Sequence, residues 1–223
     1  MKKWMLVLLT LLLIPTLSFS ADRCQQYVKD FRTYAIQYNG LEFPFWYNIG
    51  CAMQESNCRA DITSFDGGQG LLQLTPSTGI TAEIRKVIPV DPYNAKSSIR
   101  AHSYYIMTIR TQKLKQTTAK IYNKYTAHPS KYLNICGENL ADVYKAYNGG
   151  LWFVYESERG NFVCDNTEMK KFCIRGGTYT DKAKTKWLSF CEVNYSYPDK
   201  VFKYAQKYKI GNDNMRFYYK KVN

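Results

Sequence analysis

Histidine is scarce in this chain of 223 residues, which contains only His102 and His128. The chain has no Cys-x-x-Cys pair and no cluster of cysteine with histidine, so the usual spacings of a zinc site are missing. We therefore expect no metal and no other cofactor. Internal repeats and low-complexity tracts are also absent.

The remaining composition is that of one globular domain of ordinary size. Hydrophobic residues make up 45% and charged residues 22%, a balance that excludes a disordered chain and a multi-span membrane protein. Acidic residues are few, however, because Asp+Glu 18 face Lys+Arg 31 and the formal net charge is +13. Such a basic surface suits a partner that carries carboxylates or other anionic groups.

Residues 1–20 have the pattern of a secretory signal peptide. Two lysines precede an apolar core at 5–14, and Ser18 and Ser20 are the small residues of a cleavage site before Ala21. The alternative, a membrane anchor, needs about 20 consecutive apolar residues. We therefore expect a protein exported to the periplasm, the extracellular space or the cell wall, with no stable membrane span after cleavage.

In an exported protein the seven cysteines are expected to form disulfides, because oxidising compartments favour them. Three bridges and one remaining thiol are possible. Cys51 and Cys58, if both lie in one helix, are about 10 Å apart and cannot pair with each other. The sequence leaves the pairing open among Cys24, Cys51, Cys58, Cys136, Cys164, Cys173 and Cys191.

Apolar residues at steps of three and four predict a mainly α fold. In the last helix, Pro198 is expected in the first turn, and Val201, Tyr204, Ala205 and Tyr208 are expected on the buried face. The expected helices cover 21–39, 44–55, 76–86, about 99–114, 139–147 and 197–209.

Residues 151–191 differ from the rest of the chain. They contain three cysteines and several glycines, and they show no clear periodicity. We expect one domain over 21–223 that carries a disulfide-braced, irregular insertion at about 151–191.

Glu55 ends an apolar helix and precedes a polar, glycine-rich loop at 61–70. Partial burial and the negative end of a helix both disfavour an ionised carboxylate, so we expect a raised pKa for Glu55. A raised pKa is what a general acid needs near neutral pH. Taken alone, Glu55 is more typical of a surface glutamate at a helix end before an ordinary glycine loop.

Three motifs carry a family resemblance. They are the Glu-Ser pair at 55–56, the run SFDGGQGLLQLTPST at 64–78 and the sequence AYNGG at 146–150. Together they resemble the lytic transglycosylases of the soluble-lytic-transglycosylase (SLT) type, relatives of goose-type lysozyme. The resemblance covers roughly 40–150 and 192–208 and leaves 151–191 outside.

The resemblance implies a lysozyme-like helical domain with a cleft. It implies cleavage of the β-1,4 bond between N-acetylmuramic acid and N-acetylglucosamine, with Glu55 as the sole acid and base and a 1,6-anhydro sugar as product. Ser64 would lie near the reacting sugar, and Gln73 would form hydrogen bonds within the cleft. Tyr147 would orient Glu55, and Asn148 would bind saccharide, hold the loop or cap a helix.

Several alternatives stay open. A hydrolytic lysozyme would use a water-activating carboxylate, for which Asp61 and Asp66 are candidates, whereas Asp142 is expected to support the helix before Tyr147. A wall-binding module without turnover and a basic membrane-lytic protein are further alternatives. We do not expect nucleic acid as a partner, because the lysines accompany no nucleic-acid motif. The expected partner is peptidoglycan, and a wall-spanning secretion, conjugation or phage assembly is a candidate second partner.

Overall fold

The computed structural model describes residues 22–75, 80–113, 140–159, 178–181 and 186–211. The expected signal peptide at 1–20 lies outside these residues, as do Cys136, Cys164 and Cys173. None of the helices in the described part is long and apolar enough to span a bilayer.

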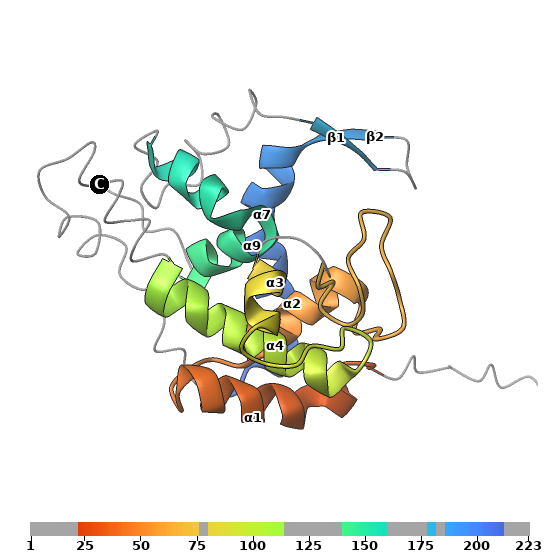
Figure 1. Cartoon of the computed structure of the whole chain (residues 1–223), viewed down its shortest axis with the longest axis vertical. Helices are drawn as coiled ribbons and strands as arrows, with labels where there is room; N and C mark the ends of the chain where they lie inside the picture. Colours follow the sequence, from red (N-terminus) through yellow and green to blue (C-terminus); the bar gives the residue numbers. More distant parts are fainter. Residues whose placement is uncertain (1–21, 76–79, 114–139, 160–177, 182–185, 212–223) are drawn as a thin grey trace, which may run out of the picture.

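The described part is mainly helical, as expected from the sequence (Figure 1). The two short strands pair in antiparallel register, with Thr178 opposite Ser189. In chain order the elements are a 3-10 turn η1 (Gln25–Tyr27), α1 (Val28–Asn39), α2 (Trp46–Ser56), α3 (Ile80–Arg85), α4 (Ala95–Thr108), a π-helical turn η2 (Ile109–Lys113), α7 (Leu140–Arg159), β1 (Thr178–Asp181), β2 (Lys186–Ser189), α9 (Phe190–Ala205) and a 3-10 turn η3 (Gln206–Tyr208).

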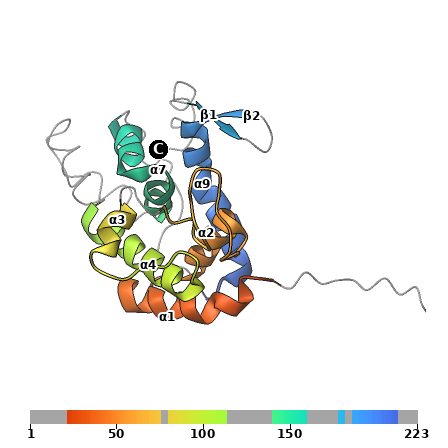
Figure 2. The ribbon, with the colours of Figure 1, turned by 45° about the vertical axis from the view of Figure 1, so that its right-hand side comes forward.

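Helix α2 occupies the centre of the arrangement. Helices α1 and α4 lie together on one side of it, and α7 and α9 lie on the other (Figures 1 and 2). The helix begins after Pro44, whose carbonyl accepts a hydrogen bond from the Tyr47 amide at 3.1 Å. It ends at Asn57, which takes a left-handed conformation with φ 53°. Seven consecutive residues of α2, from Trp46 to Ala52, are buried, so burial holds the first two turns of the helix in the core.

The contact between α2 and α9 is unusually close because Gly50 faces it. A Cβ added to Gly50 would lie 2.3 Å from the carbonyl oxygen of Val201 and 2.9 Å from the amide nitrogen of Ala205. Both distances are well inside van der Waals contact, and both involve backbone atoms. Only glycine therefore permits this separation of the two helices.

Helix α9 begins earlier than expected from the sequence. It starts at Phe190, so Pro198 lies inside the helix rather than in its first turn. Proline has no amide hydrogen, so the helical hydrogen bond to Asn194 is missing there. Val201 and Ala205 are buried as expected, whereas Tyr204 is 38% exposed and does not belong to the core.

The region after Gly150 is more regular than expected. Helix α7 continues to Arg159 across a kink at Gly150, which has φ 76° and ψ 170°. The predicted stop is therefore a kink between two helical segments. The strands β1 and β2 also fall within 151–191, so the expectation of an irregular insertion is wrong for these parts.

Replacing Gly50 with alanine should destabilise the protein. Alanine is the better helix former by about 1 kcal/mol, but overpacking typically costs about 1–3 kcal/mol, and here backbone atoms have to move. We expect a net decrease of about 1–2 kcal/mol in the free energy of unfolding, measured by urea titration. Lys203→Ala, on the exposed face of α9, is the control and should leave stability nearly unchanged. A Gly50→Ala protein as stable as the wild type would contradict the close approach of the two helices.

Candidate active site

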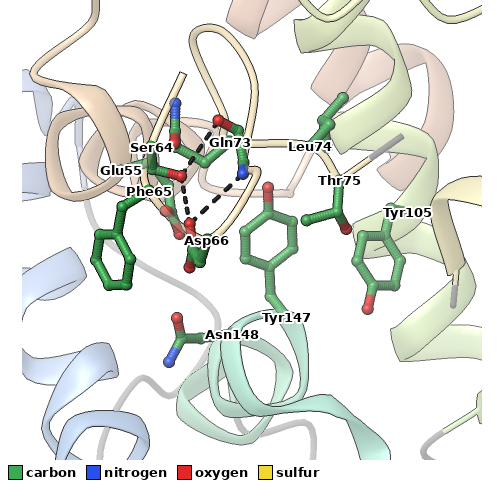
Figure 3. A pocket seen from close by; sticks show the side chains of 11 residues that line it. Glu55, Ser64, Phe65, Asp66, Gln73, Leu74, Thr75, Tyr105, Tyr147 and Asn148 are labelled. Atoms are coloured by element: carbon green, nitrogen blue, oxygen red, sulfur yellow. Dashed lines mark hydrogen bonds between the residues drawn. The ribbon is translucent and has the colours of Figure 1, made fainter. Parts of the chain in front are cut away.

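A cavity of about 310 Å³ lies beside the C-terminal end of α2. Its walls come from α2, the loop after α2, α4 and α7 (Figure 3). The lining includes all five site residues predicted from the sequence: Glu55, Ser64, Gln73, Tyr147 and Asn148. The other lining residues are Phe65, Asp66, Gly68, Leu74, Thr75 and Tyr105.

Glu55 is partly buried and lies in the last turn of α2. Burial raises its pKa from 4.5 to about 7, and the negative charge of Asp66 adds to this rise. A hydrogen bond from the Tyr197 hydroxyl to Glu55 Oε1 opposes the rise because it stabilises the ionised form. Glu55 is therefore poised between its acid and base forms near neutral pH, as expected from the sequence.

Tyr197 takes the role that the resemblance implied for Tyr147. Tyr197 is buried on α9, and its hydroxyl donates directly to Glu55. The Tyr147 hydroxyl instead donates to the carbonyl of Leu72 at 2.7 Å. Tyr147 therefore connects α7 to the loop and forms part of the cavity wall. Tyr197 was not predicted from the sequence, in which it is one of twenty tyrosines and is 142 residues from Glu55.

Cys51 lies behind Tyr197, one helical turn before Glu55. Its sulfur is 3.1 Å from the Tyr197 hydroxyl oxygen, and the side chain is buried and not in a disulfide. Burial, followed by the charge of Glu55, raises the pKa of the Cys51 thiol, so the thiol stays protonated. The Tyr197 proton points to Glu55, which leaves the thiol as the donor toward the tyrosine oxygen.

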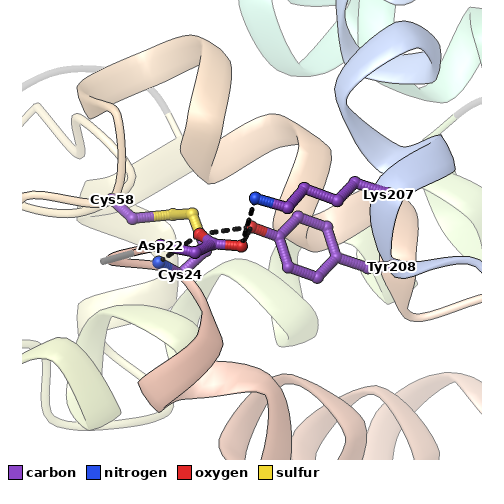
Figure 4. A network of polar contacts seen from close by, with 5 residues as sticks. All are labelled: Asp22, Cys24, Cys58, Lys207 and Tyr208. Carbon is purple, nitrogen blue, oxygen red and sulfur yellow. Dashed lines mark hydrogen bonds and ion pairs between the residues drawn. A yellow bond between two sulfur atoms is a disulfide. The ribbon is translucent and has the colours of Figure 1, made fainter. Parts of the chain in front are cut away.

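The end of α2 is also tied to the N-terminal part of the chain (Figure 4). Cys58, three residues after Glu55, forms a disulfide with Cys24. Cys51 and Cys58 do not pair with each other, as predicted, but the helix assumed for that prediction ends at Ser56, before Cys58. The disulfide holds the chain just after the end of α2.

Asp22 anchors the chain next to this disulfide. Its carboxylate accepts hydrogen bonds from the Tyr208 hydroxyl at 2.6 Å and from the Cys24 amide at 3.0 Å, and it pairs with Lys207 at 2.7 Å. Burial acts to raise the pKa of Asp22, but the hydrogen bonds from Lys207 and Tyr208 lower it overall. The carboxylate therefore stays ionised, and it links the chain before α1 to the turn η3 after α9.

The loop opposite Glu55 is held by a compact set of hydrogen bonds (Figure 3). The Ser64 amide donates to the Gly68 carbonyl at 2.8 Å, and the Gly67 amide donates to the Ser64 carbonyl at 3.1 Å. The Ser64 hydroxyl donates to Asp66 Oδ1 and lies 3.2 Å from the Gly68 carbonyl. Residues 65 and 66 are therefore held at the tip of a closed turn.

Gly68 and Gln73 pack tightly below this turn. A Cβ added to Gly68 would lie 2.8 Å from both Ser64 Oγ and Gln73 Oε1. Gln73 itself has φ 49°, and its Nε2 donates to the Gly70 carbonyl at 2.8 Å. Its Oε1 is buried and finds no hydrogen-bond donor within the described residues. Gln73 therefore lines the cavity while its side-chain oxygen is packed against Gly68.

The α7 side of the cavity is braced from two directions. Asn148 donates a hydrogen bond to the buried Asn194 of α9, so it both lines the cavity and holds α7 to α9. Asp142 forms a buried ion pair with Lys145 at 3.0 Å, in agreement with its expected supporting role. His102 packs edge-on against Tyr147 with ring centroids 4.8 Å apart. Burial lowers the pKa of His102 to about 3, so it is neutral at physiological pH.

Comparison with known proteins adds no assignment. No family model, curated protein or solved structure matches this chain.

The two further carboxylates that are candidates for water activation are placed differently. Asp66 lines the cavity with Glu55, whereas Asp61 is exposed and does not line it. Within the described residues, no group of three His, Cys, Asp or Glu side chains could hold a metal ion. The chemistry available to these residues is proton transfer by Glu55, with Asp66 as a second carboxylate in reach of the same cavity.

The raised pKa of Glu55 should make stability depend on pH. The folded state has the higher pKa and binds the proton more tightly than the unfolded chain, so the contribution is full below about pH 4.5 and is lost as the pH rises through about 7. Glu55→Gln does not titrate. Its free energy of unfolding, relative to wild type, should increase by up to about 3 kcal/mol between pH 4 and pH 8. Urea titrations at both pH values measure this difference, and a constant difference would contradict the raised pKa.

Tyr197→Phe and Asp66→Asn should move the pKa of Glu55 in opposite directions. Loss of the Tyr197 hydrogen bond removes support for the ionised form and should raise the pKa above about 7, whereas loss of the Asp66 charge should lower it. Carboxyl ¹³C NMR titration of Glu55 measures both shifts. Tyr204→Phe, on the exposed side of α9, is the control and should leave the titration unchanged.

Proposed function

We propose that this protein is a lytic transglycosylase of the SLT type, which cleaves the β-1,4 bond between N-acetylmuramic acid and N-acetylglucosamine in peptidoglycan. The observation that carries the proposal is the Glu55 carboxyl, with a pKa of about 7, in a cavity lined by hydrogen-bonding side chains. Such a carboxyl holds its proton at neutral pH and can release it to a leaving group.

The first step is proton transfer from Glu55 to the glycosidic oxygen as the bond to the anomeric carbon breaks. The 2-acetamido group of the sugar stabilises the positive charge that develops at that carbon, so the step does not need a second enzymic carboxylate. Gln73 lines the cavity beside Glu55 and holds the loop through its hydrogen bond to the Gly70 carbonyl. Glu55 is then ionised.

In the second step Glu55 acts as a base. It takes the proton from the 6-hydroxyl of the same sugar, and that oxygen bonds to the anomeric carbon to close a 1,6-anhydro ring. Glu55 thereby regains the proton that it gave, and no water is consumed. The hydrogen bond from Tyr197 favours the ionised carboxylate between the two steps and so supports both roles of Glu55.

The proposal includes a lysozyme-like fold with a cleft and a disulfide-braced insertion at about 151–191. The mainly helical architecture agrees with such a fold. Export to the periplasm or the cell wall fits the N-terminal pattern and the Cys24–Cys58 disulfide. A wall-spanning assembly remains the candidate partner beyond peptidoglycan itself.

A hydrolytic lysozyme is the second candidate because Asp66 lines the same cavity as Glu55. An ionised Asp66 that activates a water would produce a reducing sugar end instead of an anhydro ring. A wall-binding module without turnover would leave the raised pKa of Glu55 without a use.

The test is mass spectrometry of the soluble products from purified peptidoglycan, with Glu55→Gln alongside the wild-type protein. We expect muramic ends lighter than hydrolysis products by one water, and no products from Glu55→Gln, since a glutamine cannot transfer the proton. Asp66→Asn is the matched variant and should still form anhydro ends.

Hydrated ends that disappear with Asp66→Asn would instead establish the lysozyme. Binding to the wall without bond cleavage, on walls of several types, would establish the binding module.

A further inference from the structure

Phe65 is an exposed apolar side chain inside a polar site. It lines the cavity with Glu55 and is 57% exposed. The other large apolar side chains that are exposed in the described part, Leu41, Val87, Tyr93, Tyr204 and Ile210, do not line this cavity. More than half of the Phe65 side chain is therefore accessible from the cavity side or from solvent.

Hydrogen bonds hold the backbone of the loop that carries the ring. Phe65 and Asp66 form the tip of the turn closed between Ser64 and Gly68, with hydrogen bonds of 2.8 Å and 3.1 Å between backbone groups. The Ser64 side chain adds its hydrogen bonds to Asp66 and Gly68 from within the same turn. A ring on such a turn is presented with little loss of conformational entropy when a ligand binds.

Figure 3 shows where the ring points. Phe65 projects from the loop on one side of the Glu55 and Asp66 carboxyls, while Tyr147 and Asn148 rise from α7 on the other. The cavity volume of about 310 Å³ is at the low end for ligand sites, so a polymer that reaches Glu55 has to extend past its rim. Phe65 lies on that rim.

We propose that Phe65 is a specificity-determining residue that stacks against the face of an N-acetylhexosamine ring and so places the glycosidic oxygen next to Glu55. This inference rests on the proposed function. A β-1,4-linked ring of glucose configuration carries its hydroxyls at the equator and only C–H bonds on its faces. Such a face is apolar and matches the negative face of an aromatic ring.

The stacking requires a flat aromatic ring and not merely apolar area. Phe65→Trp should therefore retain binding, whereas Phe65→Ala and Phe65→Leu should both weaken it by about tenfold. Because Phe65 is exposed, none of these changes should lower the melting temperature appreciably.

Two measurements test the inference with soluble glycan strands prepared from peptidoglycan by removal of the peptides. The first is the dissociation constant of the strands for Glu55→Gln, alone and combined with each Phe65 substitution, by isothermal titration calorimetry. The second is KM and kcat for the same Phe65 substitutions with Glu55 intact. We expect the loss mainly in KM. Tyr204→Ala, which removes an exposed aromatic side chain away from the cavity, is the matched control and should change neither quantity.

The outcomes separate the two proposals. Unchanged binding and cleavage with Phe65→Ala, or full binding with Phe65→Leu, would overturn stacking and leave the proposed function standing. Strands that bind through Phe65 without being cleaved by the wild-type protein would overturn the proposed function alone. Strands that are neither bound nor cleaved would overturn both.

Discussion

The close approach of α2 and α9 at Gly50 is the constraint on which the site depends. Glycine lets the backbone of α9 lie against α2, and this brings Tyr197 within hydrogen-bonding distance of Glu55 and Cys51. A side chain at position 50 would separate the helices and remove the tyrosine from the carboxyl. The electrostatics of the site therefore depend on the packing of a residue five positions earlier in the same helix.

The pKa of Glu55 is set by interactions that act in opposite directions. Burial disfavours the charge and raises the pKa, the Asp66 carboxylate adds to this, and the Tyr197 hydroxyl acts against it. A fully apolar environment would hold the proton too tightly for release, and a solvated carboxyl would lose it near pH 4. The arrangement keeps both forms accessible, which a residue acting first as acid and then as base requires.

Several helices and the position of Glu55 at a helix end could be predicted from local patterns in the sequence. The spacing of apolar residues predicted α1, α2 and α4, and the helix end followed by glycines placed Glu55 opposite a close-packed loop. Ser64, Gln73, Tyr147 and Asn148 were implied by the family resemblance of the motifs, and they line one cavity with Glu55. The spacing also indicated that Cys51 and Cys58 do not pair, although it could not name Cys24 as the partner, because that choice depends on where α1 starts relative to α2.

Contacts between distant segments were beyond the reach of these local patterns. Twenty tyrosines gave no reason to choose Tyr197, whose partner lies 142 residues away, and Tyr147 occupied the position that the motif suggested. Pro198 indicated a helix start, but packing of α9 against α2 overrides that local preference and carries the helix through it. The kink at Gly150 could not be predicted either, because a pair of glycines is equally typical of a helix end.

The Asp22 network has a consequence for the order in which the molecule is completed. Asp22 is among the first described residues, and its partners Lys207 and Tyr208 are among the last. Because a chain is made from its N-terminus, Asp22 has only its local hydrogen bond from the Cys24 amide until Lys207 and Tyr208 have been synthesised. The segment that bears Cys24 gains this support last. The contact between these two segments of the described chain can therefore form only after all the residues between them have been synthesised.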